Sequence, residues 1–126
     1  MDFSTPTYAR QPAIDAYGDG GFRLGGQRYV GSLVLRPESD PVLWGPIDIA
    51  SVGLGDLTGL IKAKDNFDVL LIGSGVGLVR PSAFVRDALK EQSINWDVMD
   101  TGAAARTYNV LLSEGRRVAA ALIAVD

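Results

Sequence analysis

Cysteine and histidine are both absent from the 126 residues of the chain. Without cysteine there is no disulfide framework, so nothing in the sequence indicates an oxidising compartment. The two absences together exclude a Cys-rich zinc site, an iron–sulfur cluster on Cys ligands, a cysteine nucleophile and a His-dependent catalytic triad. The remaining carboxylates, lysines, hydroxyls and tyrosines form no recognisable catalytic constellation. We therefore expect no enzyme activity, no cofactor and no metal.

Long hydrophobic runs and an excess of basic residues are also lacking. The longest apolar run covers residues 118–125, far short of the roughly 20 residues that span a bilayer, so we expect no integral membrane segment. Residues 1–6 have neither the basic nor the apolar region of a signal peptide, which favours a cytoplasmic protein. With 12 Lys and Arg against 15 Asp and Glu, the net charge is −3 and the pI is near 4.8, so nucleic acid is not an expected partner.

What the chain does have is the composition of one folded domain. A length of 126 residues fits a single domain, 1–126, and an apolar fraction of 47% is enough for a hydrophobic core without cross-links. Proline and glycine interrupt residues 1–20, which show little periodicity. We therefore predict an irregular N-terminal arm over residues 1–20.

The rest of the N-terminal half is typical of antiparallel strands. Residues 22–24 and 27–30 flank a Gly-Gly pair, and glycine supplies the positive φ that a two-residue hairpin turn requires. Two further short strands are predicted at residues 32–35 and 42–44, separated by a loop with two prolines.

The second half alternates strands with helices. Apolar runs predict buried strands at residues 67–72, 94–99 and 118–125. A helix capped by Asp100 or Thr101 separates the last two, and another helix separates the first two. The order β-α-β-α-β implies a small parallel sheet with right-handed connections. Together with the antiparallel β layer from the N-terminal half, it predicts an α/β protein with three layers, β/β/α.

Two earlier helix boundaries follow from capping and spacing. The first helix is predicted over residues 56–62, with Asp56 as its N-cap. The second helix is predicted to begin at Pro81, because proline is tolerated in the first turn. Helical spacing places Phe84, Val85, Ala88 and Leu89 on one face of this second helix.

A glycine-rich loop is the most suggestive local feature. Gly73, Ser74, Gly75 and Gly77 follow the strand at residues 67–72 and lead toward the next helix. Crevices form beyond the carboxyl ends of strands in open α/β sheets, and helix starts attract anions, so the loop is a candidate crevice or anion-binding site. The third glycine of the dinucleotide-binding motif is missing, and there is no Walker lysine. The alternative is a tight turn packed against neighbouring backbone.

Polar residues in the last predicted helix form a second candidate. Arg106, Thr107 and Asn109 stand among alanines and leucines, after a strand that ends at the same sheet edge as the glycine loop. In the functional interpretation they face that crevice, with Arg106 holding an anion or a carboxylate. In the structural interpretation Arg106 pairs with Asp100 or Glu114, and Asn109 bonds to loop backbone.

Three segments carry a family resemblance: residues 72–75, 99–111 and 114–122. They resemble the domain-of-unknown-function family that includes mitochondrial complex I assembly factor three and its small prokaryotic single-domain relatives, over nearly the whole chain. The resemblance implies a three-layer β/β/α fold and no established enzyme activity. In eukaryotic members it implies help in assembling NADH:ubiquinone oxidoreductase in mitochondria. Many members carry Cys where this chain has Ala105, so the resemblance implies no thiol role here.

Two functions are carried forward from the sequence. The first is a non-catalytic binding or assembly module with a protein partner, in respiratory complex I biogenesis as the resemblance implies. The second is a small-molecule or anion-binding protein, conceivably an enzyme, that uses the glycine loop and Arg106. A homo-oligomer is compatible with either function.

Overall fold

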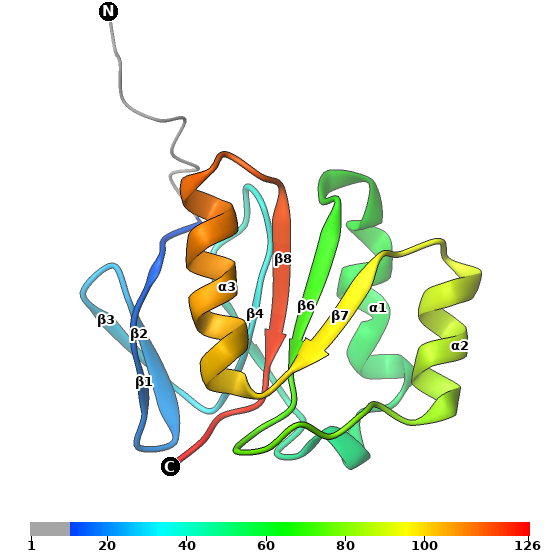
Figure 1. Cartoon of the computed structure of the whole chain (residues 1–126), viewed down its shortest axis with the longest axis horizontal. Coiled ribbons are helices and arrows are strands. Elements are labelled where there is room, and N and C mark those ends of the chain that lie inside the picture. The colour runs from blue at the N-terminus through cyan, green and yellow to red at the C-terminus, as the bar shows by residue number, and fades with distance from the viewer. Residues whose placement is uncertain (1–10) are drawn as a thin grey trace, which may run out of the picture.

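A five-stranded mixed sheet lies at the centre of the protein (Figure 1). In the computed structural model, which describes residues 11–126, its strands are β4 Ser32–Leu35, β5 Val42–Trp44, β6 Val69–Gly73, β7 Trp96–Met99 and β8 Val118–Leu122. They are arranged in the order β5-β4-β8-β6-β7. β6 pairs in parallel with both β7 and β8, whereas β4 pairs antiparallel with β5 and β8.

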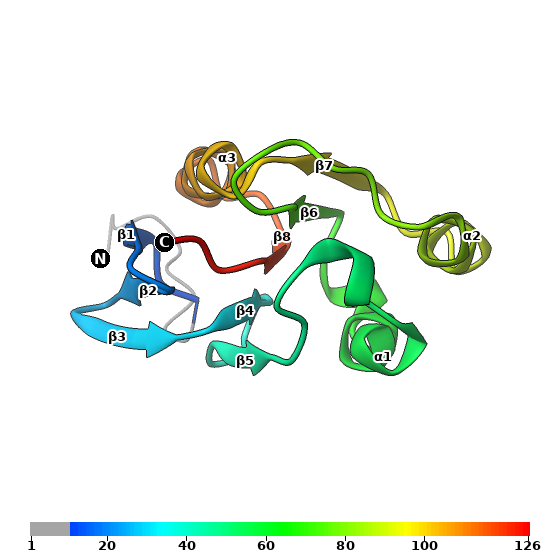
Figure 2. The same ribbon diagram turned by 90° about the horizontal axis from the view of Figure 1, so that it is seen from below.

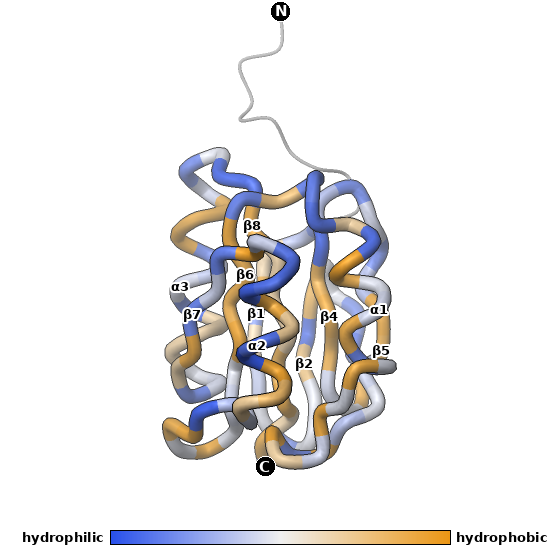
Figure 3. Tube along the Cα trace, turned by 90° about the vertical axis from the view of Figure 1, so that its right-hand side faces the viewer, coloured by the Kyte–Doolittle hydropathy of each residue, from blue (hydrophilic) through white to orange (hydrophobic). Residues whose placement is uncertain are grey.

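Two crossover helices build the parallel half of this sheet. α2 (Ala83–Glu91) connects β6 to β7, and α3 (Thr101–Ser113) connects β7 to β8. The predicted β-α-β-α-β unit is therefore confirmed. Every residue of β8 and all but the first residue of β6 are buried, as expected of strands covered on both faces. Figure 3 shows the apolar colour that runs along both strands.

A second, smaller sheet is antiparallel and consists of β1 (Ile14–Gly18), β2 (Gly21–Leu24) and β3 (Gln27–Val30). The predicted hairpin is confirmed: Gly25 and Gly26 turn between β2 and β3 with φ values of 58° and 78°. The predicted irregular arm is wrong at β1, because this strand pairs with β2. Residues 1–10 of that arm lie outside the described residues.

The main sheet is covered on both faces. One face packs against α3 and the small sheet, in a cluster that includes Phe22 and Tyr108. The other face packs against α1 (Leu54–Lys62) and α2, in a cluster that includes Leu60 and Leu89. Figure 2 shows the main sheet between these two coverings.

These layers confirm the predicted three-layer α/β class. The difference lies in β4 and β5, which we expected in the N-terminal β layer. They extend the main sheet instead, because β4 pairs with β8 at its open edge. The N-terminal half is thus divided between the two sheets.

Two helices begin differently from the prediction. The N-cap of α1 is Gly53, and Asp56 lies three residues on, where its carboxylate accepts from the Gly53 N–H at 2.8 Å. The N-cap of α2 is Ser82, whose hydroxyl accepts from the Val85 N–H at 3.3 Å. Pro81 therefore precedes the helix rather than occupying its first turn.

The remaining helical features are mixed. Asp100 caps α3, as one of the two predicted candidates, by accepting from the backbone N–H three residues on at 2.8 Å. On the face of α2 that Phe84 shares with Val85 and Leu89, the latter two are buried, whereas Phe84 is 61% exposed. Two short 3-10 turns, Ile49–Ser51 and Lys64–Asn66, flank α1.

Candidate binding surfaces

The glycine loop lies at the carboxyl end of β6, where the sequence predicted it. Hydrogen bonds of the Ser74 side chain stabilise the conformation of the loop. The Ser74 hydroxyl donates to the Gly77 carbonyl at 2.6 Å and accepts from the Val79 N–H at 3.0 Å. The side chain is buried, at 6% exposure. Ser74 therefore stabilises the turn, and its hydroxyl is already committed to the backbone.

Close packing explains the first glycine of the loop. A Cβ on Gly73 would lie 2.9 Å from Leu122 Cδ2 and 3.1 Å from the Cα of Thr101. The Thr101 hydroxyl accepts from the Gly75 N–H at 3.0 Å and donates to the Ile123 carbonyl at 2.7 Å. The loop is thus fastened to the start of α3 and to the chain that follows β8, which agrees with the structural interpretation of a turn packed against neighbouring backbone.

A cavity of about 510 Å³ opens beside the glycine loop. Ser74, Gly75 and Val76 line it together with Asp48 and the chain's last residues, 123–126. Its lining residues include the carboxylates of Asp48 and Asp126 and no Lys or Arg. Like charges repel, so this lining disfavours an anion.

The polar residues of α3 face β1 instead. Asn109 accepts from the Ile14 N–H and donates to the Ile14 carbonyl, both at 2.8 Å. Arg106 Nη1 donates to the Tyr17 hydroxyl at 3.1 Å. Thr107 is half-buried. Asn109 therefore bonds to backbone, as the structural interpretation expected, but to the strand β1 rather than to a loop. The partner found for Arg106 is Tyr17 rather than a carboxylate.

Arg106 and Asn109 line a cavity of their own, of about 320 Å³, between α3 and β1. Ala105 also lines this cavity and is 2% exposed. The glycine loop lines the other cavity described above. The structure thus brings Arg106 and Asn109 together with each other and with β1, and it places Gly75 with the residues that follow β8.

Exposed apolar side chains were missed by the sequence analysis. In the connection from β6 to α2, Val76, Leu78 and Val79 are 87%, 66% and 50% exposed. We call residues 76–79 the apolar loop. Ile47 is 84% exposed and lines the same cavity as Val76, so the apolar surface continues onto a second connection. Valine and leucine in a loop, where polar residues are usual, were the available signal, and such patches mark interaction sites.

Within residues 11–126, no three His, Cys, Asp or Glu side chains are grouped so that they could hold a metal ion. Over the same part of the chain, no helix has the length and apolar character needed to cross a membrane.

The fold and these surfaces define a three-layer α/β protein with an exposed apolar loop after β6. The profile of the family described as "Protein of unknown function (DUF498/DUF598)" matches residues 14–123. The chain belongs to this family, and the resemblance found in the sequence is confirmed.

Two relatives show the range of the family. An uncharacterised protein of Rhodobacter capsulatus is 36% identical over 118 residues, which are 94% of this chain and 89% of that protein. The human protein named NADH dehydrogenase (ubiquinone) 1 alpha subcomplex assembly factor 3 is 30% identical over 110 residues. That match covers 87% of this chain and 59% of the human protein, so this chain spans about three fifths of that relative.

Solved structures agree with the fold. A crystal structure from Bartonella henselae, described as an outer membrane protein, has a TM-score of 0.87 at 40% identity and covers 95% of this chain and 100% of its own. An NMR structure from Rhodopseudomonas palustris has a TM-score of 0.80 at 35% identity, with 98% and 90% coverage. A structure named MT938 shares the fold at 19% identity and a TM-score of 0.59, over 92% of this chain and 100% of its own.

Proposed function

We propose that this chain is a non-catalytic protein-binding module that assists the assembly of NADH:ubiquinone oxidoreductase. The observation that carries the proposal is the 30% identity over 110 residues with the human assembly factor 3. The relatives described above are an assembly factor and an uncharacterised protein, which supports binding rather than catalysis.

The apolar loop supports a protein partner. Val76 and Leu78 are 87% and 66% exposed in the connection from β6 to α2. Burying one such side chain against a partner contributes roughly 1.5–3 kcal/mol. Patches of this kind on a folded monomer are typical of interaction sites. We therefore assign the apolar loop as one surface that contacts a partner.

The test is a deletion of the gene in the source organism, followed by native electrophoresis of membranes with an in-gel NADH oxidation stain. We expect less assembled oxidoreductase in the deletion strain and full recovery with the wild-type gene. The double variant Val76→Glu/Leu78→Glu should fold normally and fail to restore assembly. The matched control is Val30→Glu/Val110→Glu, which changes side chains that are 69% and 54% exposed on β3 and α3.

Two results would count against this proposal, and they differ. Normal assembly in the deletion strain would show that the assembly role is wrong. Normal rescue by the Val76→Glu/Leu78→Glu variant would leave that role standing and show that the apolar loop is not the contact surface.

A further inference from the structure

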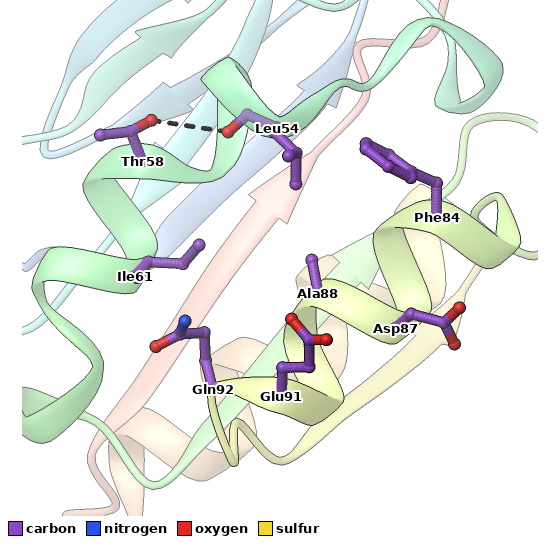
Figure 4. A pocket seen from close by; sticks show the side chains of 8 residues that line it. All are labelled: Leu54, Thr58, Ile61, Phe84, Asp87, Ala88, Glu91 and Gln92. Atoms are coloured by element: carbon purple, nitrogen blue, oxygen red, sulfur yellow. Dashed lines mark hydrogen bonds between the residues drawn. The ribbon is translucent and has the colours of Figure 1, made fainter.

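A groove separates the two helices that cover one face of the main sheet. α1 and α2 both pack on this face, and between them lies a cavity of about 520 Å³ (Figure 4). Its apolar side chains are Leu54 and Ile61 from α1 and Phe84 and Ala88 from α2. In Figure 4 these four side chains point toward one another across the groove. Leu54 and Phe84 are 46% and 61% exposed, so part of this apolar surface is unpartnered.

The charged residues that line the groove are acidic, and Lys64 lies next to it, where its Nζ donates to the Gln92 side chain at 3.3 Å. Asp87 and Glu91, one helical turn apart on α2, line the groove, and no Lys or Arg is among the eight lining residues. Arg86 and Lys90 of the same helix line a different cavity, beside β7, together with Arg80. Asp87 also lines this second cavity, and in Figure 4 its carboxylate points away from Leu54 and Ile61, whereas the Glu91 carboxylate lies beside Ala88. Glu91 therefore supplies negative charge inside the groove, and Asp87 supplies it at the rim.

The two helices that flank the groove are long enough for a short helix to lie along them. α1 and α2 have nine residues each, which corresponds to about 13 Å of helix at 1.5 Å per residue. A helix lying between them would make contact over two to three turns. It would place about three apolar side chains on the floor, at the i, i+3 or i+4, i+7 spacing of helices bound in grooves.

We propose that the groove between α1 and α2 binds an amphipathic helix of a protein partner, with its apolar stripe on the groove floor and its Lys or Arg residues opposite Asp87 and Glu91. This inference rests on the proposed function as a protein-binding module and does not depend on which complex is assembled. The carboxylates decide between occupants: they attract a cationic helix and repel the anionic headgroups of a membrane surface.

The probe for the experiment is a fluorescein-labelled, alanine-based helical peptide of 16 residues. One version carries leucine at the i, i+4, i+7 positions flanked by lysines, and a second version has glutamate in place of every lysine. We expect fluorescence anisotropy to show binding of the lysine peptide at least about tenfold tighter than binding of the glutamate peptide, and weaker binding as salt is raised.

Two sets of variants locate the binding. Asp87→Lys/Glu91→Lys should reverse the preference between the two peptides. Asp40→Lys/Glu114→Lys changes the net charge equally, at exposed sites on a loop and after α3, and should keep the wild-type preference. Phe84→Ser should weaken the binding of both peptides, because it removes part of the apolar wall of the groove.

The contrary outcomes are distinct. Binding of neither peptide, or an equal effect of the two charge-reversed variants, would overturn the groove inference. The assembly role would be unaffected by that result, because the deletion strain tests it separately. If the chain sediments with anionic vesicles and the variant Phe84→Ser does not, the groove binds a membrane surface instead of a helix. If light scattering shows a dimer, and Asp87→Lys/Glu91→Lys dissociates it, the groove binds a second copy of this chain instead of another protein.

Discussion

The hydroxyl of Thr101 donates to the carbonyl of Ile123 at 2.7 Å while it accepts from the N–H of Gly75 at 3.0 Å. Thr101 is fully buried at the start of α3. One side chain therefore joins the glycine loop, the first turn of α3 and the chain after β8. The carboxyl edge of the parallel strands, next to the apolar loop, is held in place by this buried hydroxyl.

Replacing Thr101 by Val should destabilise the protein strongly. Valine has nearly the same shape but leaves the Gly75 N–H and the Ile123 carbonyl buried without a partner, at a cost of about 2–4 kcal/mol in the free energy of unfolding. Thr101→Ser keeps the hydroxyl and should lose less. Urea unfolding followed by circular dichroism measures both, and equal stabilities of the two variants would contradict the role given to the hydroxyl.

Stability should fall at alkaline pH because of Tyr108. Burial raises the pKa of the Tyr108 phenol well above its usual value, an effect that a hydrogen bond from Gln11 opposes only in part. Since the folded-state pKa is raised, the contribution to stability is complete below about pH 10, where the unfolded phenol titrates, and is lost as pH rises above it. Urea unfolding between pH 8 and 11 should show this decline.

The variant Tyr108→Phe serves as the control for that pH dependence. Its stability should be lower at neutral pH, because the hydroxyl no longer donates to the Pro12 carbonyl, which it reaches at 3.0 Å. Its stability should also decline less above pH 10. Phenolate absorbance of the folded wild type should show one tyrosine that does not ionise near pH 10; full ionisation of all four tyrosines there would contradict the assignment.

Asn109 should control the attachment of β1. Its side chain makes two hydrogen bonds to the backbone of Ile14, so Asn109→Ala should accelerate hydrogen exchange of the Ile14 amide by about tenfold or more. Asn109→Asp keeps an acceptor for that amide and should preserve most of its protection. NMR exchange rates decide the point, and unchanged protection in Asn109→Ala would show that strand pairing with β2 is sufficient.

Two glycines should respond to alanine with opposite signs. Gly59 is exposed inside α1, and a Cβ there would lie 3.8 Å from Arg36 Nη1, an ordinary contact. Gly59→Ala should therefore raise the free energy of unfolding by about 0.5–1 kcal/mol. Gly73→Ala should lower it by about 1–3 kcal/mol, because its Cβ would press on Thr101 and Leu122. Thermal unfolding compares the pair.

The strands and the hairpin could be predicted because their signals are local. The apolar run before the glycine loop and the Gly-Gly pair at Gly25 each determine their conformation within a few residues. β1 gave no such signal, because what secures it lies on α3: Asn109 is 95 residues away from Ile14 along the chain. The exposure of Phe84 was equally inaccessible, since helical spacing identifies a face but not whether a neighbouring helix covers it.

For the predicted crevice at the sheet edge, the topology of parallel strands determines where a helix begins but not what its later residues contact. Loops that follow parallel strands do meet at one sheet edge, and Thr101, the first residue of α3, contacts Gly75 as this topology requires. Arg106 lies more than a turn further along the helix, and its side chain reaches Tyr17 of β1. Strand topology therefore predicts the contacts at the start of α3 but not those of its later turns.

The contacts that attach the N-terminal sheet can form only late in the synthesis of the chain. The groups that hold the chain at residues 11–14 belong to Tyr108, Asn109 and Val118, whose carbonyl accepts from Gln11 at 2.6 Å. At 5–20 residues per second, the ribosome needs roughly 5–20 s to pass from Ile14 to Asn109. During that interval the apolar side chains of β2 have no helix to cover them. The earliest strands to leave the ribosome are thus among the last to be secured, and their apolar side chains stay uncovered until α3 has been made.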